Sequence, residues 1–384
     1  MKTFNKTFLI SISFLFAGTC HSVKADEHIN ETSDSAILTG TSESKTLIEK
    51  AEEKMPDWMK DVADRIQLHG YAQGGYTYRH QDGRNTNSFE IYRVLFWANA
   101  QITPRWSFLF MHDFSSVVQE YYTDFRVTRN KALTVRFGQF KHGYSYENPL
   151  SPTSMETIDV YSDGVVYLAG CGSDPLYGVQ YGRDLGAAIY GNLFKDKFRY
   201  EFDVLNGQGI NSRDRNNKKD MILRLEYKPV KGLNLVATGQ LGRGNALVGG
   251  TILNPTLQAG ENYLRNRWSV GFDYKSADFN IHGEYLEGKD GSATSRGAYV
   301  TGAVPVGKGV ELVGSYDFFN FNTSLGMDQH KAIAGVQYWF YKKCRVQLQY
   351  VYKSAYTQAG QFVHGANHAI MAQMQIRLDY AKKK

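Results

Sequence analysis

The stretch TVRFGQFKHGYSYENPLSPTSMETID, residues 134–159, joins a strand to an unusually long loop. Apolar Val135 and Phe137 alternate with polar neighbours, and this period of two predicts a β-strand. The period stops after Lys141, so that residues 142–183 form a predicted loop of roughly forty residues. Because so long a loop is uncommon in a compact domain and is usually functional, we expect it to set the specificity of the protein.

The same period of two continues through residues 66–380. In the last segment one face carries Ile370, Ala372, Met374, Ile376, Leu378 and Tyr380, and the other carries Gln373, Gln375, Arg377 and Asp379, with Met371 as the exception. Sixteen candidate strands follow: 66–79, 88–102, 105–115, 119–130, 132–141, 184–194, 197–206, 219–228, 233–242, 266–275, 278–288, 295–305, 309–320, 329–341, 343–354 and 367–380. Segment 88–102 places Leu95 and Trp97 on the face of Arg93, which indicates either a β-bulge or a wrong phase.

The connections between these segments alternate in length. Tight turns such as Thr103-Pro104 and Ser276-Ala277 follow even-numbered segments. Most connections after odd-numbered segments are longer and polar, such as 82–87, 207–218, 243–265 and 355–366. This parity is typical of an up-and-down outer-membrane barrel and would not persist in a Greek-key sandwich. The predicted fold is therefore all-β: a transmembrane antiparallel β-barrel of about 16 strands.

The composition fits a wall with one apolar face and one wet face. Aromatic residues make up 14% of the chain, yet the mean hydropathy is −0.42. After the N-terminal segment, no apolar run approaches the roughly 20 residues of a transmembrane helix. Aromatic residues gather near the predicted strand ends, where membrane-interface girdles are expected: Trp106, Tyr227, Trp268, Tyr274, Tyr338, Trp339, Tyr341, Tyr352 and Tyr380.

The N-terminus has the pattern of a secretory signal peptide. Lys2 and Lys6 precede an apolar run at residues 8–18 that is too short to span a bilayer. Cleavage after Ala25 is the favoured site, and Cys20 leaves a lipoprotein alternative open. Residues 1–25 are therefore assigned to a signal peptide.

After this cleavage Cys171 and Cys344 remain, in an oxidising compartment. The strand map places them at opposite ends of the barrel. We therefore expect two unpaired thiols.

Residues 26–65 are acidic, whereas the predicted barrel is basic. The first stretch has 11 acidic and 5 basic residues, a net −6, and residues 66–384 have 27 and 36, a net +9. Residues 26–65 are predicted to be a periplasmic arm, flexible at first and then a short helical segment broken at Pro56. An apolar stripe on that helix serves either oligomerisation or packing beneath the barrel. Basic residues of the barrel are scattered, which argues against nucleic-acid binding.

Three stretches occur in a fixed order: FGQFKHGYSYENPLSPTSMETID at 137–159, GRDLGAAIYG at 182–191 and VLNGQGINSRDRNNKKDMILRLEYKP at 204–229. They resemble the phosphate-selective porins of the O and P type, which have a Gly-Gln-Phe-Lys strand end before a constriction loop. The second stretch is similar to that family's Arg-Asp-x-Gly strand start, and the third to its Asn-Gly loop before a Lys-Asp strand. The resemblance covers essentially all of residues 66–380.

This resemblance implies a homotrimeric, water-filled channel in the Gram-negative outer membrane, surrounded by outer-membrane lipid. It implies passive diffusion of small hydrophilic solutes, with phosphate or other anions as the family's guide to the solute. Such a channel is not an enzyme and needs no cofactor. The long third loop is expected to fold inward.

The loop departs from the family in its charges. Where the family commonly has an acidic–Arg pair, this chain has Thr157-Ile158-Asp159-Val160, and the loop contains no Lys or Arg. Its acidic residues, among them Glu147, Glu156 and Asp159, would bring negative charge to the constriction, whereas anion pores direct positive charge at the lumen. The sequence therefore leaves anion and cation preference open.

Positive charge is expected on the inward faces of the strands instead. The candidate channel-lining anion contacts are Arg93, Arg126, Arg136, Lys141, Arg183, Arg224, Arg267, Arg345 and Arg377. Acidic neighbours such as Asp124 and Glu226 share these faces. The basic residues therefore either create a transverse field across the lumen or pair with carboxylates and stiffen the wall.

Two other classes of function compete with the channel. The loops at 142–183 and 243–265 could make a receptor or adhesin surface. His142 and Ser145 could belong to an outer-membrane lipid hydrolase, but no acidic partner or nucleophile-elbow signature accompanies them. The histidines show no zinc-site spacing, and no metal is expected. Polar residues on every inward face favour the channel, because neither alternative needs a wide wet lumen.

Overall fold

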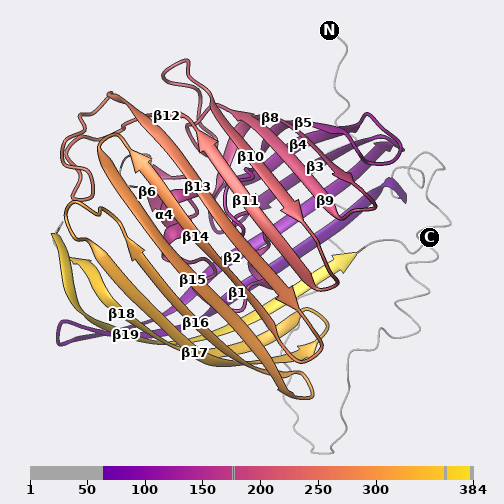
Figure 1. Ribbon diagram of the computed structural model, residues 1–384. Helices are drawn as coiled ribbons and strands as arrows, with labels where there is room; N and C mark the ends of the chain where they lie inside the picture. The colour runs from indigo at the N-terminus through magenta and orange to yellow at the C-terminus, as the bar shows by residue number, and fades with distance from the viewer. Residues whose placement is uncertain (1–63, 175, 177, 359–360, 381–384) are drawn as a thin grey trace, which may run out of the picture. The chain divides into compact units, whose positions relative to one another are not determined.

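The computed structural model describes residues 64–174, 176, 178–358 and 361–380, and its sixteen long strands form a closed antiparallel barrel (Figure 1). They are β1 (Ile66–Gln81), β2 (Arg84–Thr103), β3 (Trp106–Asp113), β4 (Val118–Arg126), β5 (Thr134–Lys141), β8 (Arg183–Leu193), β9 (Phe198–Leu205), β10 (Asp220–Tyr227), β11 (Leu233–Leu241), β13 (Asn262–Lys275), β14 (Asn280–Asp290), β15 (Ala293–Gly307), β16 (Val310–Asn320), β17 (Asp328–Tyr341), β18 (Cys344–Gln358) and β19 (Gln361–Tyr380). Each pairs with the next, and β1 pairs with β19. The predicted signal peptide, and the predicted arm up to residue 63, lie outside the described residues.

Strand alternation separates a lipid face from a lumen face, as the sequence predicts. On β19, Met374 and Leu378 point outward and are 51% and 72% exposed, whereas inward Gln373 and Gln375 are buried. Closure leaves the ladder without a free edge, so backbone hydrogen bonds are satisfied inside a bilayer. Within the described part of the chain, no helix is long and apolar enough to cross a membrane.

Most of the predicted girdle aromatics are exposed, but Trp339 is not part of a girdle. Trp106, Tyr227, Trp268, Tyr338, Tyr341 and Tyr380 are among the exposed large side chains. Trp339 lies on the inward face, where the Arg345 guanidinium stands 4.8 Å from its ring centre and its Nε1 donates to Glu311 at 3.0 Å. The prediction for Trp339 is wrong because adjacent strand residues face opposite sides of the wall.

Strand β2 contains a β-bulge. Gln73 pairs with Arg93, but the next residue, Gly74, pairs with Ile91, so Tyr92 is the extra residue. Arg93 donates to Gln73 Oε1 at 3.1 Å on the lumen side. The bulge is therefore present, but it precedes Arg93 and leaves the phase of the following residues unchanged. Leu95 and Trp97 lie inward on the face of Arg93, and the Arg377 guanidinium stands 5.5 Å from the centre of the Trp97 ring.

Two segments predicted as loops belong largely to strands, and one strand ends earlier than predicted. Residues 84–87 belong to β2, and β18 and β19 extend to Gln358 and from Gln361, so 82–87 and 355–366 are not long loops. The residues of these segments pair with the neighbouring strand. Because the segments are polar, the sequence predicted loops where the structure has the ends of hairpins. Strand β4 ends at Arg126, leaving a turn at 127–133.

The extended connection after β5 is not structureless. It contains a 3₁₀ turn, η1 (Pro152–Ser154), the helix α4 (Asp163–Leu168) and the two-residue strands β6 (Ser173–Asp174) and β7 (Gly178–Val179). Ser162 caps α4, its Oγ accepting from the backbone N–H of Val165 at 3.3 Å. The loop after β11 adds a short strand, β12 (Arg243–Asn245), which pairs with β13.

Candidate functional site: the constriction loop and its wall

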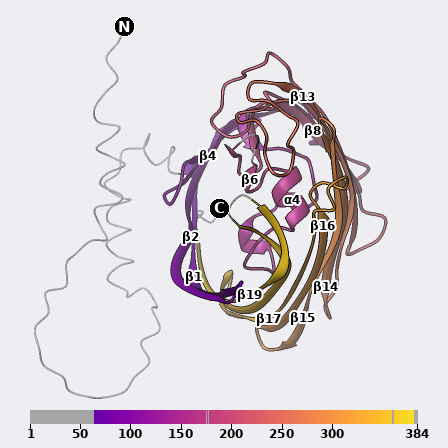
Figure 2. The same cartoon turned by 90° about the vertical axis from the view of Figure 1, so that its left-hand side faces the viewer.

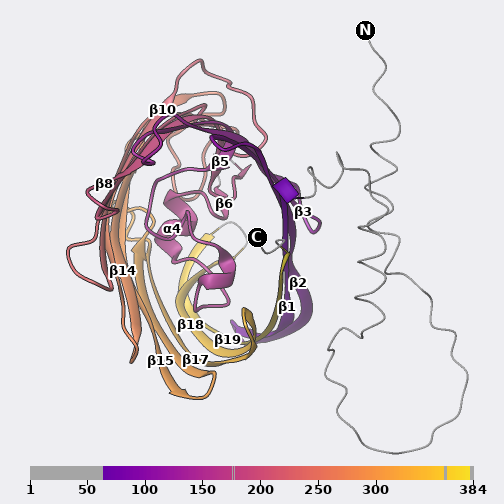
Figure 3. The ribbon, with the colours of Figure 1, turned by 90° about the vertical axis from the view of Figure 1, so that its right-hand side faces the viewer.

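Residues 142–182, here called the constriction loop, lie inside the barrel. Figures 2 and 3, which view the barrel from two sides, both show α4 within the ring of strands. The loop leaves from β5 and returns at β8, which are paired neighbours, with Lys141 opposite Arg183. The predicted inward fold is thereby present, and the end of β5 positions it.

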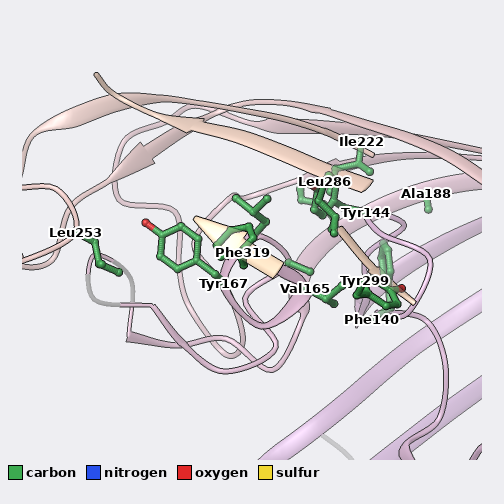
Figure 4. Close-up of a cluster of buried hydrophobic side chains, with 13 residues drawn as sticks. Phe140, Tyr144, Val165, Tyr167, Ala188, Ile222, Leu253, Leu286, Tyr299 and Phe319 are labelled. Carbon is green, nitrogen blue, oxygen red and sulfur yellow. The ribbon is translucent and has the colours of Figure 1, made fainter. Parts of the chain in front are cut away.

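Apolar contacts fix the middle of the loop. Figure 4 shows Val165 of α4 near Leu286 and Phe319 of the wall, and all three are buried. A second cluster surrounds Ile158, which packs with Ile333, Val351, Ala369 and Met371. The exceptional apolar residue on the polar face of β19, Met371, is therefore part of a socket for the loop tip.

The first turn of the loop is held by polar wall residues. Ser145 Oγ donates to Glu284 Oε2 and the N–H of Tyr146 donates to Glu284 Oε1, both at 2.8 Å. The N–H of Gly143 donates to Asp203 Oδ2 at 2.8 Å. Ser145 has φ of 70°, an uncommon conformation for a non-glycine residue, and these bonds stabilise it.

His142 is a buried neutral imidazole. Its Nε2 lies 3.0 Å from the carbonyl of Ala169 and therefore carries the proton, while Nδ1 faces the Asn148 amide at 3.3 Å. Burial lowers the pKa of His142 to about 3, and the nearby Arg265 acts in the same direction. His142 and Ser145 are therefore each committed to other partners, and the contacts show no Ser–His hydrogen bond between them in this described segment.

Two of the loop carboxylates are internal partners of the wall. Glu147 accepts from the N–H of Ser162 at 2.8 Å, and its other oxygen lies 3.3 Å from His282 Nε2. Glu156 accepts from Asn280 at 2.8 Å and lies 3.8 Å from His282 Nδ1. Both carboxylates are buried, so their charge meets the wall and not the open lumen.

A third carboxylate, Asp163 at the start of α4, joins a buried charge cluster. Lys331 Nζ lies 2.8 Å from Asp163 Oδ1 and 3.2 Å from Asp317 Oδ2, and Gln329 donates to Asp163 at 2.5 Å. Burial by itself would raise the pKa of Asp163, but Lys331 and then Lys353 outweigh burial and hold that pKa below its ordinary value.

Asp159 differs because it faces water. Its side chain is 28% exposed, and its nearest cation, Lys353, is equally exposed at 3.7 Å. The expectation that Glu147 and Glu156 bring negative charge to the constriction is therefore wrong, because both carboxylates are buried against partners. Of the three predicted acidic residues, Asp159 is the one that meets solvent. Sequence spacing could not reveal this, because the partners come from β14 and β18.

Five of the candidate anion contacts hold the loop. Lys141 donates to the carbonyl of Leu150 at 2.6 Å, and Arg345 to that of Met155 at 2.5 Å. Arg377 donates to Thr153 Oγ1 at 2.7 Å. Arg224 donates to the carbonyls of Gly143 and Ser145, and Arg267 to that of Leu168. Each of these side chains takes the place of water at an oxygen atom of the loop. No sequence pattern indicates this role.

Two further candidates pair with strand carboxylates. Arg136 forms a two-pronged ion pair with Asp124, at 2.8 and 2.9 Å, and Arg183 lies 2.7 Å from Glu120. Arg93 has a neutral partner, the Gln73 amide, and Arg126 has no side-chain partner among the described residues. Arg93 is close enough to the loop to act electrostatically on Tyr161, whose pKa is raised well above its ordinary value by burial and lowered in part by Arg183 and Arg93.

The chain matches a known protein family over most of its length. The model of the phosphate-selective porin O and P family matches residues 65–380. The chain belongs to this porin family. No curated protein sequence gives a significant match.

Solved porin structures have the same fold at low sequence identity. An anion-selective porin from Comamonas acidovorans aligns with a TM-score of 0.60 at 14% identity, covering 82% of this chain and 99% of that one. Salmonella typhi OmpF in complex with daunomycin gives a TM-score of 0.60 at 12% identity, covering 82% and 98%. Vibrio cholerae OmpT, in its trimer form, gives 0.54 at 16%, covering 81% and 99%. At these identities the likeness establishes the barrel and nothing finer.

The two cysteines of the barrel are unpaired in this porin, as predicted. Cys171 Sγ donates to Asn148 Oδ1 at 3.1 Å, and burial raises the pKa of the Cys171 thiol to about 12. Cys344 is buried at the start of β18.

Two inward cations near the loop tip are not among the predicted anion contacts. Lys353 and Arg79 face the lumen from β18 and β1, in register with wall residues around the Ile158 socket. Both positions follow from strand alternation once the register is known, which was the missing information.

Proposed function

We propose that this outer-membrane porin conducts small anions in preference to cations, through the gap between the constriction loop and the wall of β1 and β2. Its membership of the family makes it an outer-membrane channel for small solutes. The single observation that carries the anion preference is Arg93: its guanidinium lies on the lumen side of the wall, acts electrostatically on Tyr161 of the loop, and has a neutral amide as its hydrogen-bond partner.

The charge balance at the gap supports the same conclusion. Arg79 and Arg93 are permanent cations on the β1–β2 wall, and Lys353 of β18 lies beside the carboxylates of Asp159, at 3.7 Å, and Asp163, at 3.6 Å. Glu90 and Asp159 are the opposing carboxylates, whereas Glu147, Glu156 and Asp163 are buried against partners. A water-filled gap with a positive excess raises the local concentration of anions.

Reversal potentials in a salt gradient test this proposal. The wild-type channel is expected to favour chloride, and Arg93→Gln to move the reversal potential toward zero. Arg126→Gln is the matched control, because Arg126 also faces inward without a carboxylate partner but lies at the turn end of β4. Cation preference in the wild type would overturn the proposal, and phosphate titrated into the same bilayer tests for block by that anion.

We further propose a homotrimer, a leader cleaved near Ala25, and no enzymatic step. The trimer is supported by the family resemblance and by the trimer form of the OmpT structure. The absence of a catalytic step is supported by the commitments of His142 and Ser145 to other groups. Light scattering of the purified protein, N-terminal sequencing and ester hydrolysis before and after Ser145→Ala test the three points.

A further inference from the structure

The lipid-facing side of the barrel carries a notch across β10, β11, β13 and β14, which Figure 1 shows side by side. Its volume is about 600 Å³. Apolar side chains such as Phe202, Leu223 and Trp268 line it, and all point outward. The notch is thus separate from the lumen and from the constriction loop.

Gly239 creates the notch. It pairs with Leu223 on one strand and with Trp268 on the other. The row across these three strands therefore has two large side chains with no side chain between them. An added Cβ at Gly239 would meet nothing within 4 Å, so the space is open. With neighbouring strands about 4.8 Å apart, one missing side chain leaves room for one extended hydrocarbon chain.

One end of the notch is charged. The outward residues of β14 change from Tyr285 to Glu287 and Lys289 as the strand approaches its loop end. Arg296 lies directly opposite Glu287 on β15, and Tyr285 donates to Glu287 at 3.0 Å. Lys289 is exposed and has no side-chain partner in the described part of the chain, so the rim keeps a net positive charge.

We propose that this notch binds one anionic phospholipid-like molecule, with an acyl chain over Gly239 and the phosphate at Lys289 and Arg296. The occupant must be amphipathic, because the floor is apolar and only the loop end carries charge. It must be anionic, because Lys289 is unmatched. Trp268 lies opposite Glu287, where the apolar floor meets the charged rim, and its amphipathic ring suits such a boundary.

Native mass spectrometry of the full-length protein tests the site, with phosphatidylglycerol or phosphatidylcholine of the same acyl chains added. The wild type is expected to retain phosphatidylglycerol about tenfold more strongly than phosphatidylcholine. Gly239→Leu fills the notch and is expected to abolish retention of both lipids. Lys289→Gln keeps the floor and is expected to remove the preference for phosphatidylglycerol.

Two matched controls separate this site from the general lipid face. Gly314 is another outward strand glycine with open space above its Cα, and Gly314→Leu is expected to leave retention unchanged. Lys308 lies in a turn at the opposite end of the strands, and Lys308→Gln is likewise expected to be silent. Migration of unheated samples on a gel confirms that each barrel is closed.

Three results would overturn the proposal: undiminished retention in Gly239→Leu, equal loss in Gly314→Leu, or an unchanged lipid preference in Lys289→Gln. If Gly239→Leu fails to close, Gly239→Ala with Lys289→Gln carries the test. A change in oligomer mass with unchanged lipid retention would mean that the notch seats a second copy, which also contradicts the proposal.

Discussion

Lys331 and Asp163 form the buried ion pair that joins the barrel wall to the constriction loop, with Nζ and Oδ1 2.8 Å apart. Asp317 lies on the other side of the same ammonium at 3.2 Å and accepts from the N–H of Asp163 at 2.6 Å. One wall cation thus lies between a loop carboxylate and a wall carboxylate, and Lys353, 3.6 Å from Asp163, is a second cation beside them. The position of the helix α4 depends on that balance.

Removing this cation should release the loop. Lys331→Met leaves Asp317 buried without its cation and Asp163 with only the more distant Lys353, at 3.6 Å. Losing one member of a buried pair costs about 3–5 kcal/mol. We expect larger, noisier single-channel conductance and faster proteolysis within residues 142–182. Lys231→Met, in an exposed turn, is the control, and unchanged conductance and proteolysis in Lys331→Met would contradict this role.

Acid should loosen the loop through His142. In the undocked loop His142 has its ordinary pKa near 6.5, whereas in the docked loop burial, aided by Arg265, lowers the pKa to about 3. Between these values the undocked state binds the additional proton, so docking weakens as pH falls from about 6.5 toward 3. The loss at pH 4.5 is about 3 kcal/mol for this group alone.

Channel closures or loop proteolysis recorded from pH 7 to pH 4.5 would measure this dependence. His142→Gln keeps an amide donor for the Ala169 carbonyl and removes the titration of this one group, so its profile should be shallower than that of the wild type over that range. An identical slope in the variant would show that another group titrates. Asp163 does not confuse the result, because its pKa is lowered and its contribution is lost only at more acid pH.

Much of the barrel follows from the sequence because strand alternation and turn parity are local properties. Met371 shows the limit of such local properties. Met371 breaks the polar face because it meets Ile158, a residue over two hundred positions earlier in the chain. The polarity of a strand residue reports its face, but not which distant loop will cover it.

The charges of the site were harder to foresee for the same reason. Glu147 and Asp163 appear in the sequence as free loop acids, yet His282 and Lys331 of the wall are their partners. Likewise, Leu95 and Trp97 lie inward beside Arg93 although they are apolar, and the bulge at Tyr92 precedes all three. The faces of most strands could be read from the sequence, whereas long-range pairing required the register.

A side chain added at Gly164 should also displace α4. A Cβ there would lie 3.0 Å from Phe319 Cδ2 and 3.2 Å from Leu286 Cδ1, already closer than ordinary contact, so Gly164→Leu overpacks the buried cluster. Overpacking costs about 1–3 kcal/mol, and conductance should rise as the loop lifts. Val166→Leu, on the half-buried side of the helix, should leave conductance unchanged, and equal effects of the two would contradict this account.

Removing the exposed charge of Asp159 should strengthen anion preference without releasing the loop. The carboxylate lies 3.7 Å from Lys353 Nζ and both side chains meet water, so the pair contributes little to docking, at most about 1 kcal/mol. Asp159→Asn removes one of the two carboxylates beside Lys353 and leaves Asp163, at 3.6 Å, as the other. The reversal potential should therefore move further toward that of chloride, while loop proteolysis stays as in the wild type. Asp278→Asn, in an exposed turn, controls for the loss of any one acidic charge. A shift toward cations, or an equal shift in Asp278→Asn, would show that ions do not pass beside Asp159 and Lys353.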